Sequence, residues 1–270
     1  MKKVIINADD FGYSAAVNAG IIKAYQDGVL TSTTLMANMS GRDGAIQLAK
    51  ENQGLGVGGH LVLTCGQPLT PATSLTNEEG QFYHLEDYKK NRPLMKEEEI
   101  FHEWSSQIDY LLENGLKLTH LDSHHHVHTF PENLAITQRI AEKYQLCFRN
   151  AFDLEKQINL PYQKNISRFL DLMNYPSIRD LNQSFAENMA ACLAEIQSVV
   201  EQVEDDEVTE LMVHPAFVDE SLYFGSSFHL QRTKEVAILC AEQLKNLLDE
   251  QEITLCNYQE ISAGHLIVNH

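Results

Sequence analysis

The chain has little basic charge and few cysteines. Its 270 residues carry 38 acidic and 20 basic side chains, which gives a formal net charge of −18 at pH 7. A field of this sign repels nucleic acid backbones and anionic membrane surfaces, so we expect neither as a partner. The five cysteines contain no CxxC pair, which argues against a disulfide framework. We therefore expect reduced thiols in a cytoplasmic protein.

Long apolar runs and familiar catalytic motifs are also missing. The apolar run at residues 4–8 is too short for a signal-peptide core, and no later run approaches the roughly 18 residues of a membrane helix. The sequence has no P-loop, no GxGxxG in a suitable context and no GxSxG elbow, and the HEW at 102–104 is not HExxH. A serine or cysteine nucleophile therefore lacks support, and metal-assisted hydrolysis is favoured.

Strand and helix patterns alternate along the chain, as they do in βα units. About seven such units predict one domain over residues 1–270, either a distorted or incomplete (β/α) TIM-like barrel or an open doubly wound sheet. We predict strands at 4–8, 29–36, 54–63, 116–121, 145–148, 209–213 and 253–256, and helices at 15–28, 43–52, 97–114, 131–144, 184–203 and 231–249.

Three segments interrupt this alternation. Residues 64–95 are rich in Pro, Gly, Thr and Asn, and an insertion of this length is more often functional than idle. Residues 151–183 read as loop plus one helix, and residues 220–230 as a loop.

The segment THLDSHHHVHTFPE at 119–132 concentrates five of the twelve histidines within nine positions. Imidazole and carboxylate groups are metal ligands, although a solvated histidine-rich loop is the alternative. In an extended chain, Asp122, His124, His126 and His128 would share one side and His125 would face the other. One ion cannot take all of them as ligands, so some would orient the ligands instead.

Polar residues also stand at the carboxyl ends of other predicted strands. Asp9 and Asp10 follow the first strand, His60 lies near the end of the third, and Arg149 and His214 each follow a later one. Each has a structural alternative: a turn, a bonded core histidine, a surface ion pair, or an extended residue before proline. Because parallel strands end at one edge of a sheet, the coincidence favours a shared site.

Two of these positions carry specific expectations. Neighbouring strand residues point to opposite faces, so Asp9 and Asp10 reach one site only if the backbone bends, for which Phe11-Gly12 is the candidate. His214 suits a general acid, because a histidine titrates close to neutral pH.

Taken together, the motifs resemble one protein family. NADDFG at 7–12, TSTT at 31–34, GxHLxLT at 58–64, THLDSHHHVHxFP at 119–131 and HPAF at 214–217 are similar to the YdjC-like carbohydrate deacetylases, particularly the chito-oligosaccharide deacetylases. The resemblance implies a distorted (β/α) barrel that removes N-acetyl groups from amino sugars with one divalent ion, and a homodimer. It also implies metal ligation by Asp10, His60 and His124, with Asp9 as base and His214 as acid.

We therefore expect a hydrolase that releases acetate from a small acetylated oligosaccharide or its phosphate, with Mg²⁺ or Zn²⁺. The rivals are a metal-dependent phosphoesterase or sugar isomerase on a similar barrel, and a non-catalytic metal-binding or sugar-binding protein. The sequence leaves open the roles of Asp122, His126, His128 and Arg149, and which of Asp9 and Asp10 is base and which is ligand.

Overall fold

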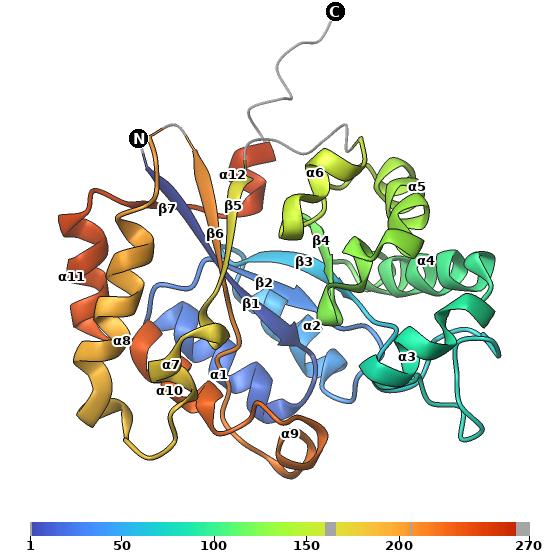
Figure 1. The fold of residues 1–270 in the computed structure, drawn as a ribbon, viewed down its shortest axis with the longest axis horizontal. Helices are drawn as coiled ribbons and strands as arrows, with labels where there is room; N and C mark the ends of the chain where they lie inside the picture. The colour runs from blue at the N-terminus through green and yellow to red at the C-terminus, as the bar shows by residue number, and fades with distance from the viewer. Residues whose placement is uncertain (1, 160–165, 206, 263–270) are drawn as a thin grey trace, which may run out of the picture.

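A computed structural model describes residues 2–159, 166–205 and 207–262, and Figure 1 shows a curled parallel sheet surrounded by helices. The strands follow the order β4-β3-β2-β1-β6-β5, and β7 pairs with β1 off this path. Their bounds are β1 Lys3–Phe11, β2 Ser32–Leu35, β3 Gly56–Leu61, β4 Leu121–Ser123, β5 Ile166–Asp171, β6 Val208–Val213 and β7 Thr254–Leu255. Every pairing in the sheet is parallel.

Strand β1 is the centre of the sheet, because it pairs with β2 on one side and with β6 on the other. All its residues after Lys3 are buried, which explains why the N-terminal segment is an uninterrupted apolar run before its two aspartates. The path of the sheet ends at β4 and β5, and a single bridge from Phe148 to Leu121 extends the β4 edge. The arrangement is the expected incomplete (β/α) barrel.

Most of the predicted helices are present, and local sequence explains where they begin. Ser14 caps α1 by accepting from the backbone N–H of Val17, and Ser184 with Glu187 forms a capping box at α8. The longer helices are α1 Ala15–Gln26, α2 Arg42–Glu51, α4 Glu97–Glu113, α5 Leu134–Tyr144, α8 Phe185–Val200, α10 Gln231–Leu239 and α11 Glu242–Glu250. The shorter ones are α3 Leu85–Asn91, α6 Leu154–Gln157, α7 Pro176–Arg179, α9 Glu220–Gly225 and α12 Tyr258–Ser262.

Several predicted elements differ from the structure. The strand predicted at 116–121 lies later, as β4, and the one at 145–148 is reduced to the bridge at Phe148. The insertion at 64–95 contains α3, and the loop predicted at 220–230 begins with α9. The segment 151–183 contains β5, which pairs with β6 over five register positions, whereas residues 160–165 lie outside the described part of the chain. β5 is a strand because it pairs with the buried strand β6, and no local sequence pattern indicates this pairing.

The helix predicted at 231–249 is two helices, α10 and α11. The carbonyl of Leu239 accepts from the backbone N–H of Val29, after the end of α1, instead of continuing the helix. Ala241 is extended and occupies the N-cap position of α11, where it makes no side-chain cap. No glycine or proline marks this break, so the sequence predicted one continuous helix.

Candidate active site

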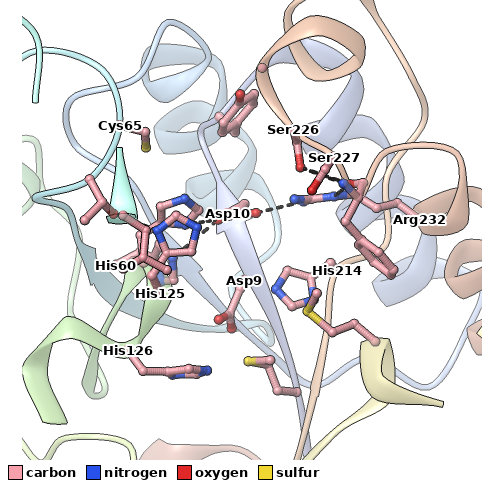
Figure 2. Close-up of a pocket in the computed structure, with 18 of the residues that line it drawn as sticks. Asp9, Asp10, His60, Cys65, His125, His126, His214, Ser226, Ser227 and Arg232 are labelled. Atoms are coloured by element: carbon pink, nitrogen blue, oxygen red, sulfur yellow. Dashed lines mark hydrogen bonds and ion pairs between the residues drawn. The ribbon is translucent and has the colours of Figure 1, made fainter. Parts of the chain in front are cut away.

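A pocket of about 620 Å³ opens at the carboxyl ends of the strands (Figure 2). The five residues predicted to form the site all line it, although they come from distant parts of the chain: Asp9, Asp10, His60, His124 and His214. The predicted convergence of strand ends is therefore present. Arg149 lies beneath this lining, fully buried.

Asp9 and Asp10 both reach the pocket because the backbone bends at Asp10 itself. Asp10 has φ 69°, and the register between β1 and β2 shifts between Ala8 and Phe11. The pair therefore lies inside β1, and the bend falls one residue before the predicted Phe11-Gly12. A non-glycine residue in this left-handed region costs on the order of 1–3 kcal/mol, a cost that is typical of functional sites.

Asp10, His60 and His124 form a compact group with ligand atoms within 4.8 Å of one another. Nε2 of His60 lies 3.3 Å from Oδ1 of Asp10, and Nδ1 of His124 lies 3.1 Å from the same oxygen. The Nε2 atom of His60 is buried and meets no hydrogen-bond geometry with the described residues. Two imidazole nitrogens and a carboxylate directed at one point are a donor set for a divalent ion.

Asp122 determines which nitrogen of His60 faces this point. Its Oδ1 lies 2.7 Å from Nδ1 of His60, and its Oδ2 accepts from the Thr34 hydroxyl at 2.9 Å. A carboxylate bound to Nδ1–H fixes the tautomer and leaves Nε2 free for a metal. Asp122 is fully buried and does not line the pocket, so it orients a ligand.

The electrostatics of the group favour positive charge. Burial alone would lower the pKa of His60, but Asp122 and Asp10 outweigh it and raise that pKa to about 10. The pKa of His124 is likewise well above its usual range despite burial, because Cys65 and Asp10 lie beside it. A cation bound at this point would satisfy the same carboxylates.

A second set of potential ligands, Asp9, His60 and Asp122, is also compact, but Arg149 already provides its positive charge. Arg149 Nη1 contacts Asp9 Oδ2 at 2.7 Å and Asp122 Oδ2 at 3.0 Å, and Nη2 contacts Asp9 Oδ1 at 2.5 Å. We had expected Arg149 to bind a substrate group or a surface carboxylate. It is instead a buried tie between active-site carboxylates.

Arg149 also determines the protonation state of Asp9. Burial would raise the pKa of Asp9, but the charge and hydrogen bonds of Arg149 hold it well below its usual range. Behind Arg149, Glu210 accepts from Nε at 2.8 Å and from the Tyr258 hydroxyl. Asp9 is therefore an ionised carboxylate held in one orientation.

His214 faces Asp9 across the pocket and is neutral. Burial, with the charge of Arg232 next, lowers the pKa of His214 to about 4. Its backbone N–H donates to the buried Glu235, and its Nδ1 has no hydrogen-bond partner among the described residues. Arg232 in turn donates to Oδ2 of Asp10 at 2.8 Å.

The histidine segment does not form the extended chain that we predicted. Residues 124–129 form the 3-10 helix η2, and His125 and His126 have φ of 56° and 54°. His124, His125 and His126 all line the pocket, whereas His120 and His128 are buried outside it. The expected alternation of sides is therefore wrong.

The other histidines have identifiable contacts. His125 Nδ1 lies 2.9 Å from the Thr64 hydroxyl, and His128 Nδ1 lies 2.6 Å from the Ser123 hydroxyl. His120 stacks on Tyr258 at a centroid distance of 3.6 Å. Burial, with the charge of Arg149 next, lowers the pKa of His126 to about 3, so this ring is neutral.

Three residues of the site were missed from the sequence. Arg232 and Glu235 lie on α10, where their spacing is that of an ordinary polar helix face. Asp171 lines the pocket at the end of β5, and burial raises its pKa to about 6. Recognising β5 would have placed Asp171 at a strand end, but nothing local distinguishes the other two.

Comparison with known proteins supports the family that the sequence motifs resemble. The family model described as YdjC-like protein matches residues 3–250. The chain belongs to the YdjC-like family. A carbohydrate deacetylase of Brevibacillus brevis is 40% identical over 260 residues, covering 96% of this chain and 99% of the relative. One from Vibrio cholerae is 37% identical over 265 residues, covering 98% of each.

Solved structures show the same architecture. A crystal structure from Enterococcus faecalis, described as a candidate cellobiose-phosphate cleavage protein, has a TM-score of 0.81 at 31% identity and covers 96% of this chain and 98% of its own. A CE4 esterase from Streptococcus mutans has a TM-score of 0.53 at 12% identity, with 94% and 85% covered, and shares the fold alone. Within the described residues, no helix is both long and apolar enough to cross a membrane.

Proposed function

We propose that this YdjC-like protein is a metal-dependent carbohydrate deacetylase that hydrolyses the N-acetyl group of an amino sugar. One observation carries the proposal: the group Asp10, His60 and His124 shares a single pocket with an ionised Asp9 and with His214. Full-length relatives named carbohydrate deacetylase support the same chemistry. The substrate class is small acetylated oligosaccharides of the chitin type, with or without a phosphate.

Asp10, His60 and His124 would hold one divalent ion, with Asp122 orienting His60. When bound, such an ion polarises the acetyl carbonyl and makes water a stronger acid. Two histidines and one carboxylate suit Zn²⁺, and Mg²⁺ with retained waters also fits the set. Metal analysis of the purified protein distinguishes the two.

Asp9 and His214 would move the protons. Asp9 is ionised and fixed by Arg149, so it accepts a proton from the attacking water. His214, on the opposite side, delivers a proton to the departing amine nitrogen. Its low pKa means that the imidazole is neutral at rest, so the proton that it delivers is the one that Asp9 has removed from the water, passed on to His214 before the amine departs. The products are acetate and a free amino sugar.

The test is release of acetate from N-acetylated disaccharides, with bound metal measured on the same samples. His124→Ala should lose both the metal and turnover, whereas His102→Ala, at an exposed position on α4, should lose neither. Full activity of His124→Ala would refute the ligand assignment. Release of phosphate from a model ester without release of acetate would favour the phosphoesterase alternative. Metal binding without any turnover would favour a non-catalytic protein.

A further inference from the structure

The two aspartates of β1 lie opposite a single residue of β2. Ala8 pairs with Thr33, and the next pair in register begins at Phe11, so Asp9 and Asp10 together occupy one position of the ladder. Such a two-against-one arrangement is a β-bulge, a device that redirects side chains next to active sites. Strand β6 pairs in regular register with β1 only as far as Ala8. The backbone of the bulge therefore depends on contacts other than those with β6.

Thr33 holds the bulge on its N-terminal side. Its hydroxyl donates to the carbonyl oxygen of Ala8 at 2.7 Å, immediately before the two aspartates. Thr33 and Ala8 are both fully buried, so water does not compete for this bond, and a buried carbonyl that loses its donor is destabilising. Thr33 belongs to the TSTT segment at 31–34, and the chemistry proposed above gives it no role.

Asn18 on α1 holds the bulge on its C-terminal side. Its Oδ1 accepts from the backbone N–H of Gly12 at 2.7 Å, and its side-chain amide donates to the carbonyl of Gly41 at 2.8 Å. Gly41 in turn donates to the carbonyl of Gly12 at 2.9 Å, and Tyr13 donates to the carbonyl of Asp10 at 3.0 Å. Asn18 is only 3% exposed. The turn that follows the aspartates is thus fixed by one buried side chain.

We infer that Thr33 and Asn18 are positioning residues, which hold the bulge so that Asp9 and Asp10 both face the pocket (Figure 2). Asp10 has φ 69°, and a residue in this region persists only where its surroundings determine its conformation. In a regular strand, neighbouring side chains point to opposite faces, so relaxation of the bulge would turn one aspartate away. Neither Thr33 nor Asn18 lines the pocket, so each acts through the backbone.

A second buried threonine provides a matched control. Thr209 on β6 is 1% exposed, and its hydroxyl has no hydrogen-bond partner among the described residues. Strands β2 and β6 flank β1 on its two sides, and Thr209 pairs with Val4, away from the bulge. Thr33→Val and Thr209→Val therefore remove the same atom from equivalent surroundings, but only the first removes a bond to the bulge.

The experiment measures the Kd for Zn²⁺ by chelator competition, and kcat and KM for acetate release from an N-acetylated disaccharide at saturating Zn²⁺. Thr33→Val should weaken Zn²⁺ binding roughly tenfold, because Asp10 is no longer held toward the two histidines. It should lower kcat roughly 10- to 100-fold, as a small misplacement of a catalytic group does, with KM nearly unchanged. Thr33→Ser, which keeps the hydroxyl, should recover most of both losses. Thr209→Val should match the wild type.

Asn18→Leu tests the same bulge through an independent contact, and it decides the case if Thr33→Val does not fold. It should also weaken Zn²⁺ binding and lower kcat. A hydrogen bond with a purely structural role would change only the urea midpoint. Wild-type Zn²⁺ affinity and kcat in Thr33→Val or Asn18→Leu, or an equal loss in Thr209→Val, would therefore overturn the inference.

The kinetic part of this inference rests on the proposed deacetylase function, whereas the Zn²⁺ affinities do not. A wild type that binds Zn²⁺ but releases no acetate would refute the deacetylase function, and the Kd values would still decide the role of Thr33. A wild type that binds no Zn²⁺ would refute the metal group and this inference with it.

Discussion

Replacing Arg149 with methionine should reveal how strongly the active site depends on one buried charge. The guanidinium contacts Asp9, Asp122 and Glu210 at 2.5–3.0 Å, and the side chains of all four residues are at most 4% exposed. Methionine fills similar space without the charge and leaves three buried carboxylates without their cation. Removing one partner of a buried ion pair costs about 3–5 kcal/mol of stability.

The loss of stability in Arg149→Met should depend on pH in a defined direction. Without Arg149, burial raises the pKa of these carboxyls in the folded state, as it already does for Glu210. A carboxyl whose folded pKa exceeds its unfolded pKa stabilises the protein at low pH, and that stability is lost as pH rises. The wild type has the opposite sign at Asp9, whose pKa is lowered. The loss in Arg149→Met should therefore be larger at pH 8 than at pH 5.

Urea unfolding measures this directly, because Trp104 is the single tryptophan and is fully buried, so its fluorescence reports unfolding. The control is Arg139→Met, which removes the same side chain from an exposed pair with Glu98 and should change stability little at either pH. Buried ion pairs contribute several kcal/mol when one partner is removed. A decrease in the free energy of unfolding of Arg149→Met below about 1 kcal/mol, or an equal decrease at pH 5 and pH 8, would therefore refute the stabilising role of Arg149.

Three further changes test other parts of the site. Asp122→Asn should weaken metal binding about 10- to 100-fold in chelator competition, because His60 loses the carboxylate that orients it; unchanged affinity would contradict that role. Asp9→Asn should lower acetate release about 10²- to 10⁴-fold while metal content is retained, and near-normal turnover would exclude Asp9 as base. Glu235→Gln should remove a pH dependence. Burial raises the pKa of Glu235 from 4.5 to about 8, so its contribution to wild-type stability is present below pH 4.5 and lost as pH rises toward 8. Between pH 4.5 and pH 8 the free energy of unfolding of the wild type should fall by up to about 5 kcal/mol relative to that of the variant, as measured by urea unfolding. The same dependence of stability on pH in both proteins would contradict this role of Glu235.

The alternation of strands and helices limited the fold to a (β/α) barrel or a doubly wound sheet, the family resemblance favoured the barrel, and the convergence of strand ends predicted which residues meet. Asp9, His60 and His214 stand at or near the ends of segments whose apolar runs identify them as buried strands, and parallel strands end at one edge of the sheet. β5 could not be predicted, because its identity as a strand depends on pairing with β6. Tertiary context of this kind overrides local propensity.

The buried ion pairs around the pocket could not be predicted from the sequence either. Arg232 and Glu235 appear in the sequence as ordinary polar residues, and Arg149 was expected to bind a substrate group or a surface carboxylate, whereas the fold buries all three and places Arg149 and Arg232 beside aspartates of β1. Sequence spacing carries no information about contacts across 140 or 222 residues. A buried charge is therefore recognised only once its partners are placed.

The histidine segment shows why a regular backbone was the wrong assumption at the centre of the site. A strand would direct His124 and His125 to opposite faces, and a helix would spread three successive side chains around its axis. The structure places His124, His125 and His126 all in the pocket lining, which requires the left-handed backbone at the second and third positions. Each such residue costs on the order of 1–3 kcal/mol. That cost is retained where each ring has a defined place in the pocket: His124 belongs to the proposed metal group, His125 is bonded to Thr64, and His126 lines the pocket.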